Sequence, residues 1–146
     1  MLFRSNPYAA PVAAVRDFAD AAPADVIARL NVSDAWKQKF MLIAKAGGPK
    51  LQNTSELTRG ERMKIMFNVL AFLFGPLYLL AKGLWRPALA LTAVLLLAMI
   101  LLDVVLSVAG APQLGKMLGY GAAAVYAVRA NVCYYSKMVL GQKTWF

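Results

Sequence analysis

The sequence predicts an all-α integral membrane protein with a small cytoplasmic helical head, and three observations support this fold class. First, residues 87–109 form an apolar run in which Asp103 is the single charge. A helix rises about 1.5 Å per residue, so this run matches the roughly 30 Å hydrocarbon core of a bilayer. Second, apolar residues make up 60% of the chain and charged residues only 16%. Third, the charges gather before residue 64 and at the ends of the apolar runs.

Residues 1–63 are predicted to form the head, which begins with a flexible tail and continues in short helices. Its clearest helix carries three apolar residues at helical spacing, which form one stripe: Trp36, Phe40 and Ile43. The stripe fits a helix packed against a neighbour, or a helix lying on the membrane surface with its lysines at the headgroups. Another helix is expected to begin at Glu56, with Ser55 as its N-cap.

The membrane domain is predicted over residues 64–146. Its first apolar segment, residues 65–81, is at the lower length limit for a span, and the pair Gly75-Pro76 breaks it. This membrane break leaves two alternatives, a short span or a re-entrant hairpin that returns to the side where it began. Two packed transmembrane helices are then expected over residues 87–109 and 114–136.

Basic residues favour the re-entrant alternative. If the first segment crosses, they divide four against four, with Arg59, Arg62, Lys64 and Lys116 opposite Lys82, Arg86, Lys137 and Lys143. If it re-enters, only Lys116 lies outside, against seven basic residues on the cytoplasmic side. Cytoplasmic loops carry the excess of Lys and Arg in membrane proteins. Because prolines and charges also interrupt the N-terminal apolar positions, no secretory signal is expected, and the head is expected to stay cytoplasmic.

The last span carries small residues at every fourth position, a helix-packing ladder that lets another backbone approach closely: Gly115, Gly119, Ala123 and Ala127. The ladder is expected to pack on the helix over residues 87–109, or else to form a dimer interface. Ionisable and polar residues in the same spans mark a candidate polar membrane site: Asp103, Tyr120, Arg129 and Asn131. With a turn near Pro112, Asp103 is expected opposite residues 120–123, so a direct salt bridge to Arg129 needs a shifted register.

Basic and aromatic residues flank the apolar runs and are predicted to form a lipid-headgroup collar: Lys64, Lys82, Trp85, Arg86, Lys137 and Lys143. Given the net charge of +9, the basic residues are therefore expected to bind anionic lipid rather than nucleic acid. Membrane lipid is the first expected partner, and a membrane-protein partner or a second copy of the chain is the other.

The sequence offers no catalytic, cofactor-binding or metal-binding residues. It has no histidine and one cysteine, Cys133, which excludes an internal disulfide, a Cys/His metal centre and histidine acid–base catalysis. It also lacks a phosphate-binding loop and a serine-nucleophile elbow. We therefore expect a non-enzymatic scaffold or accessory subunit that binds partner helices, anionic lipid or both. The alternative is an oligomeric small-molecule or ion pathway through the polar membrane site, and a membrane enzyme ranks third.

Motifs over residues 33–137 follow a distinctive order. The first block contains Phe72, Phe74, Gly75, Pro76 and Tyr78, and it is followed by Gly83, Trp85 and Arg86. A closing element contains Ala130, Asn131, Tyr134 and Tyr135. In this order the motifs resemble a family of small bacterial inner-membrane proteins of unknown function. The resemblance implies an inner-membrane location and supplies no activity. Together with the predicted spans, it leads us to expect a multi-pass protein of the bacterial inner membrane.

Overall fold

A computed structural model describes residues 23–146, and these residues form helices, turns and loops without a strand. The all-α prediction is confirmed for this part of the chain. The predicted flexible tail, and the helices expected before Pro23, lie outside the described residues.

The described part of the head contains three α-helices and two short 3-10 helices: α2 (Pro23–Arg29), α3 (Asp34–Lys45), η1 (Gly48–Lys50), η2 (Thr54–Glu56) and α4 (Arg59–Met66). The expected N-cap at Ser55 is wrong, because residues 54–56 form η2 and the α-helix begins after Thr58. The Thr58 hydroxyl accepts from the backbone N–H of Glu61, whose carboxylate accepts from the backbone N–H of Thr58. This reciprocal capping box satisfies two backbone donors that a helix N-terminus otherwise leaves open.

The apolar stripe of α3 packs inside the protein. Phe40 and Ile43 are fully buried. The Phe40 ring lies 5.5 Å from the Tyr134 ring and 5.8 Å from the Tyr135 ring, both on the last helix. Of the two alternatives for this stripe, packing against a neighbouring helix is therefore the one that the structure shows.

The segment over residues 65–81 is not one continuous helix. It contains the end of α4, then α5 (Val69–Phe74) and α6 (Pro76–Ala81), each six residues long. Gly75 joins them at φ 52° and ψ −124°, a conformation that only glycine adopts readily. Six residues of helix rise about 9 Å, so neither helix can cross a bilayer. The break predicted at Gly75-Pro76 is present.

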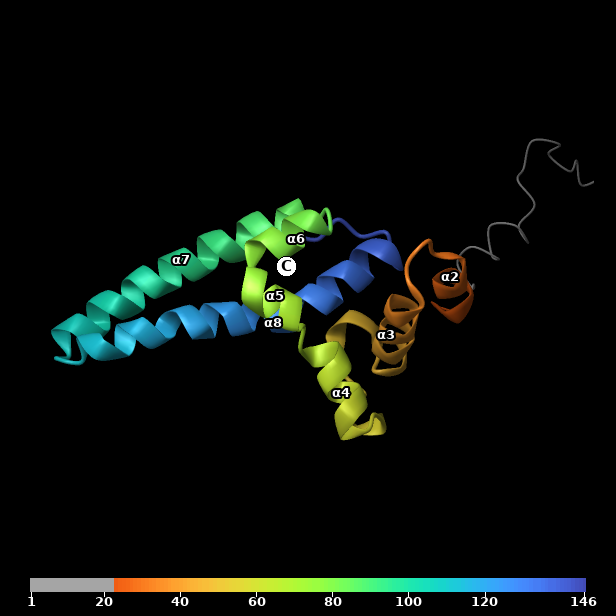
Figure 1. The fold of residues 1–146 in the computed structure, drawn as a ribbon, viewed down its shortest axis with the longest axis horizontal. Coiled ribbons are helices and arrows are strands. Elements are labelled where there is room, and N and C mark those ends of the chain that lie inside the picture. The colour runs from red at the N-terminus through yellow and green to blue at the C-terminus, as the bar shows by residue number, and fades with distance from the viewer. Residues whose placement is uncertain (1–22) are drawn as a thin grey trace, which may run out of the picture.

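The two longest described helices are α7 (Trp85–Val108) and α8 (Leu118–Met138), and the short helix η3 (Pro112–Met117) lies between them in the chain. Most of α7, η3 and the N-terminal half of α8 form an arm that projects from the rest of the molecule (Figure 1). Among the described helices, α7 is long and apolar enough to cross a membrane, and only 6% of its most apolar stretch is buried. The second predicted span, residues 114–136, divides into η3 and α8, and α8 does not meet the same standard of length and hydropathy. The structure therefore shows one candidate membrane helix among residues 23–146.

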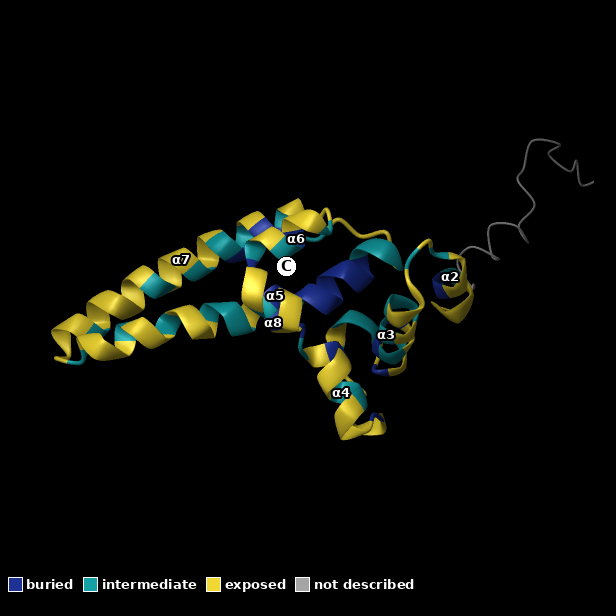
Figure 2. Ribbon diagram, in the orientation of Figure 1, coloured by how far each residue is buried: buried dark blue, intermediate teal, exposed yellow. Residues whose placement is uncertain are grey.

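The core surrounds the C-terminal half of α8 (Figure 2). Almost every residue of α8 from Tyr126 to Ser136 is buried. Buried residues from α2, α3 and α4 join the same cluster as those from α5, α6, α7 and α8. The head and the residues after position 64 thus share one core, and the exposed arm extends from it.

Candidate functional site

Two tryptophans and one arginine meet where the arm joins the core. The rings of Trp85 and Trp145 lie 5.8 Å apart at an edge-to-face angle of 77°. The Arg86 guanidinium lies 5.3 Å from the first ring and 5.4 Å from the second, a geometry that favours cation–π attraction. Arg86 also donates to the carbonyl oxygen of Lys143 at 3.2 Å, which ties the C-terminal residues to the start of α7.

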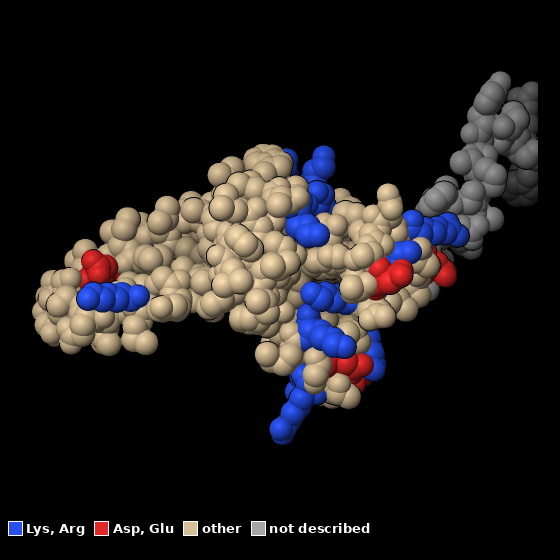
Figure 3. Space-filling model, viewed as in Figure 1, with Lys and Arg blue, Asp and Glu red and all other residues tan. Residues whose placement is uncertain are grey.

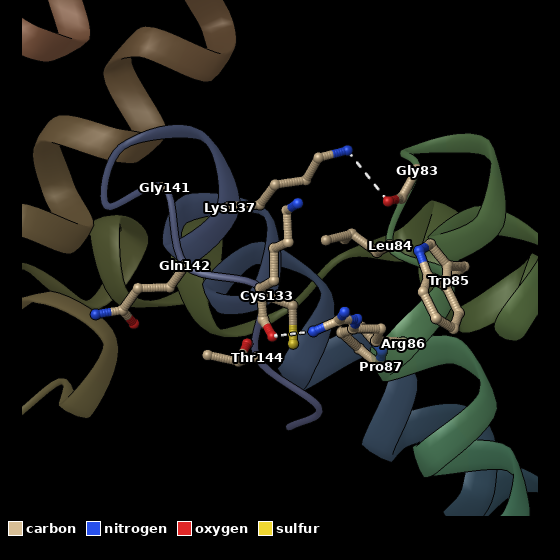
Figure 4. Close-up of a pocket in the computed structure, with 11 residues that line it drawn as sticks. Gly83, Leu84, Trp85, Arg86, Pro87, Cys133, Lys137, Gly141, Gln142 and Thr144 are labelled. Atoms are coloured by element: carbon tan, nitrogen blue, oxygen red, sulfur yellow. Dashed lines mark hydrogen bonds between the residues drawn. The ribbon is translucent and has the colours of Figure 1, made fainter.

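Lys137 connects α8 to the turn between α6 and α7 (Figure 4). Its ammonium donates to the carbonyl oxygens of Lys82 at 3.0 Å and Gly83 at 3.1 Å. Gly83 has φ +68°, and a Cβ there would lie 2.6 Å from the Lys137 nitrogen. A pocket of about 340 Å³ lies between this turn and residues 141–144, with buried Cys133 and Arg86 among its lining residues. Arg86 and Lys137, two of the cations that line this pocket, thus already donate hydrogen bonds to backbone carbonyls of the chain.

The predicted lipid-headgroup collar is largely brought together. Trp85, Arg86, Lys137 and Lys143 line this pocket, and Lys82 adjoins it through Lys137. Lys64 does not line it. Lys64 and Lys82 instead line a second groove.

The second groove, which we call the lysine groove, has a volume of about 370 Å³ and lies between α3, α4, α5 and α6. Its lining residues are Ser33, Ala35, Trp36, Lys39, Lys64, Phe67, Asn68, Val69, Leu70, Tyr78 and Lys82. The Lys82 ammonium lies 4.9 Å from the Trp36 ring, 4.9 Å from the Tyr134 ring and 6.0 Å from the Tyr78 ring. The Lys39 ammonium lies 4.8 Å from the same Trp36 ring. Burial, and then the nearby charge of Lys82, lower the pKa of Lys39.

A buried polar hub lies beside the lysine groove and joins four helices. The Asn68 amide donates to Asn131 Oδ1 at 2.8 Å and to the Tyr78 hydroxyl at 3.1 Å, and its own oxygen caps α5 at Ala71. The Asn131 amide donates to the Ile65 carbonyl at 2.9 Å at the end of α4. Sequence reasoning selected Asn131 and missed Asn68. A lone asparagine inside the apolar run IMFNVLAFLF was the signal that could have found it.

The candidate polar membrane site does not assemble. Asp103 lies against η3, where a Cβ on Gly115 would be 2.5 Å from its Oδ1. The expected position of Asp103 opposite residues 120–123 is wrong, because residues 112–117 form a 3-10 helix that folds back along α7. From Leu118 to Arg129 α8 rises about 16 Å, which leaves Arg129 too far for a salt bridge to Asp103. Tyr120 is 71% exposed, and Asn131 belongs to the hub.

The four residues of the helix-packing ladder lie in different surroundings. Gly115 faces Asp103, whereas a Cβ on Gly119 would meet nothing within 4 Å. Ala123 is half-buried, and Ala127 is fully buried with its carbonyl accepting from the Asn68 backbone N–H at 3.1 Å. Gly115 belongs to the 3-10 helix η3, whereas Gly119, Ala123 and Ala127 lie in α8 at a spacing of four and share one face of that helix. An intermolecular role for Gly119 stays a prediction.

Comparison with known proteins gives a family and no activity. A family model described as "Protein of unknown function (DUF2628)" matches residues 21–139. The uncharacterized protein YigF of Salmonella typhimurium strain LT2 is 31% identical over 123 residues, which cover 79% of this chain and 91% of the relative. The YigF protein of Escherichia coli K12 is 32% identical with the same coverage. No solved structure matches this chain. The predicted resemblance to an uncharacterised bacterial family is confirmed, and the inner-membrane location stays a prediction.

Proposed function

The chain belongs to the DUF2628 family of proteins of unknown function, and from that premise we propose a non-enzymatic inner-membrane scaffold or accessory subunit. In this proposal α7 and the outer half of α8 lie in the bilayer. The head stays on the cytoplasmic face, and the base of the arm contacts anionic lipid headgroups. The non-enzymatic part rests on a sequence without histidine or a recognisable catalytic motif.

The exposed surface of α7 is the observation that carries the proposal. Large apolar side chains over most of the circumference of the helix are exposed: Leu89, Val94, Leu96, Leu97, Ile100, Leu101, Leu102, Val104, Val105 and Val108. A helix with so large an apolar surface belongs in a protein core or in a membrane, and only 6% of the most apolar stretch of α7 is buried within the described chain. An exposed apolar surface of this extent is typical of a membrane or protein contact.

The distribution of charge supports an orientation. On the face drawn in Figure 3, Lys and Arg side chains gather over the head and the base of the arm, and the arm is free of charge except near its tip. The tryptophan pair Trp85 and Trp145 lies at the boundary between the two regions. Tryptophan is enriched at membrane–water interfaces, and basic residues are enriched on the cytoplasmic side.

The two short helices support a shallow, re-entrant position for residues 65–81. Large apolar side chains of α5 and α6 are exposed: Val69, Leu70, Leu73, Phe74, Leu77 and Leu80. Since neither helix is long enough to cross, the proposal places them in the cytoplasmic half of the bilayer beside the base of the arm. The structure offers no observation that favours an ion or solute pathway, because the polar residues expected to line it are separated.

Cysteine accessibility in intact cells tests the proposal. Single cysteines replace exposed residues in a Cys133→Ala background: Arg59→Cys in the head, Ala81→Cys at the end of α6, and Gln113→Cys at the arm tip. We expect the protein in the carbonate-resistant membrane fraction, with an impermeant thiol reagent labelling only Gln113→Cys. Recovery in the soluble fraction would overturn the membrane assignment. Labelling of Ala81→Cys from outside would overturn the re-entrant placement alone.

A further inference from the structure

We propose that the lysine groove binds the phosphate group of an anionic phosphate ester, with a phospholipid headgroup as the favoured source. The choice of a lipid source rests on the proposed membrane location. The phosphate chemistry of the groove does not depend on it.

An excess of positive charge is the first support, although the Glu61 carboxylate, outside the lining, is near enough to Lys64 for the two charges to attract. Three lysines line the groove: Lys39 in α3, Lys64 in α4 and Lys82 directly after α6. The lining, drawn from residues 23–146, includes no carboxylate. Burial, and then the charge of Lys82, another cation, lower the pKa of Lys39. Like charges held in a partly buried groove repel one another, and a bound anion relieves that repulsion.

Aromatic rings hold two of these ammonium groups in place without using their hydrogen-bond donors. The rings of Trp36, Tyr78 and Tyr134 surround Lys82, and Trp36 also supports Lys39. Lys37 and Lys137 donate to backbone carbonyls, whereas within the described residues the groove lysines form no such bond. Positioned cations with open donors are arranged to receive a ligand that accepts several hydrogen bonds.

The number of donors that line the groove favours phosphate over a carboxylate. Lysine binds phosphate as a flexible point charge, and a phosphate ester has enough oxygens to accept from several lysines together. Tyr78 adds a hydroxyl whose oxygen already accepts from Asn68 at 3.1 Å, which leaves its own proton for an acceptor in the groove. The volume of about 370 Å³ lies within the usual range of small-ligand sites.

The rim of the groove favours a lipid as the source of the phosphate. Val69 and Leu70, on its α5 side, are 61% and 53% exposed. An apolar edge beside a cationic interior matches a headgroup whose acyl chains continue into the bilayer next to α5. A soluble phosphate ester would bind through the lysines and Tyr78 and would make no use of this apolar edge.

Binding to the purified full chain in an uncharged detergent tests the phosphate chemistry. The groove variant Lys39→Gln/Lys64→Gln/Lys82→Gln is compared with the control variant Lys50→Gln/Arg59→Gln/Lys116→Gln, which removes the same charge at exposed positions outside the groove. The probes are inorganic phosphate and glycerol 3-phosphate, measured by calorimetry at constant ionic strength. We expect at least tenfold weaker binding in the groove variant and unchanged binding in the control.

Lipid retention identifies the source. The same proteins are placed in nanodiscs of mixed phosphatidylglycerol and phosphatidylcholine and analysed by native mass spectrometry. A preference for phosphatidylglycerol that the groove variant alone loses supports the headgroup. Groove-dependent binding of the soluble esters without that preference supports a soluble phosphate ester. If neither measurement separates the groove variant from the control variant, the proposal is overturned.

Two further measurements keep these outcomes distinct. If the triple variant has lost helical circular dichroism, the single Lys64→Gln variant replaces it. The Lys64 side chain is exposed, whereas the ammonium groups of Lys39 and Lys82 lie over aromatic rings. The single variant should weaken binding about threefold, and unchanged binding there would equally overturn the proposal. Membrane fractionation of the groove variant should match the unmodified protein, so failure of the groove is separable from failure of the membrane assignment.

Discussion

Asn131 connects three parts of the molecule through one side chain. It is fully buried, accepts from Asn68 and donates to the Ile65 carbonyl. Asn131 could be selected from the sequence because it is a polar residue within a mostly apolar predicted helix. Its partners were not predictable, because they lie more than 60 positions away and depend on how α4 and α5 meet α8.

Asn131→Leu should destabilise the protein. The substitution leaves the Ile65 carbonyl and one Asn68 donor without partners in a buried site, and each such group typically costs about 1–3 kcal/mol. Thermal unfolding in detergent should show a clear fall in Tm, with Val128→Leu at a half-exposed position on the same helix as the control. An Asn131→Leu protein as stable as the control would show that the hub does not hold these helices together.

Gly83→Ala should be more harmful than Gly141→Ala. Both glycines have positive φ, +68° and +63°, so both substitutions strain the backbone by about 1–2 kcal/mol. Only the Cβ at position 83 also meets the Lys137 ammonium, at 2.6 Å. The difference in Tm between the two variants therefore measures the loss of the Lys137 bonds to the α6–α7 turn. In a Lys137→Ala background the two glycine substitutions should become equivalent, and a persisting difference would contradict this account.

At the scale of helices, hydropathy predicted the long helix well and the shorter ones less well. The apolar run over residues 87–109 corresponds to α7, which begins at Trp85 and ends at Val108. Hydropathy also predicts a second span over residues 114–136, yet the C-terminal half of α8 is buried by protein. Hydropathy reports that a residue avoids water. It does not report whether lipid or another helix covers the residue.

The Gly75-Pro76 break should decide whether residues 65–81 cross the membrane. Gly75→Ala with Pro76→Leu removes the positive-φ residue and restores a backbone donor, which favours a continuous helix through α5 and α6. We expect the Ala81→Cys reporter to become accessible to an impermeant thiol reagent from outside. Unchanged protection of this reporter would mean that the Asn68 hub, and not the break, fixes the path of the chain.

At the scale of the whole molecule, the sequence predicted a charged base and an apolar arm, and it missed the lysine groove. The collar residues flank the apolar runs in the sequence. Their meeting at one end of the arm therefore follows from the order in which the runs occur along the chain. Trp36 and Lys39 are far in sequence from Tyr78, Lys82 and Tyr134, and they meet only because α3 packs against α8. Pairing of distant helices is not encoded in any local pattern that periodicity detects.

Phe40→Ala should loosen α8 although the residue belongs to the head. Phe40 is fully buried against Tyr134 and Tyr135, and removing a buried phenylalanine costs about 3–5 kcal/mol. Hydrogen exchange should speed up across residues 126–136, whereas Met41→Ala, at a 46% exposed neighbour, should leave it unchanged. Faster exchange confined to α3 would indicate that the head and the arm are separate cooperative units.

The shortness of α5 and α6 has a consequence for the shape of the surrounding bilayer. Each rises about 9 Å, so in the proposed orientation they add cross-section to the cytoplasmic leaflet while the opposite leaflet contains only the two-helix arm. An inclusion that is wider in one leaflet than in the other acts as a wedge. Such a wedge should concentrate where the membrane is convex toward the cytoplasm. Equal density of the protein on supported membranes shaped with convex and concave ridges, with its orientation fixed, would contradict this expectation.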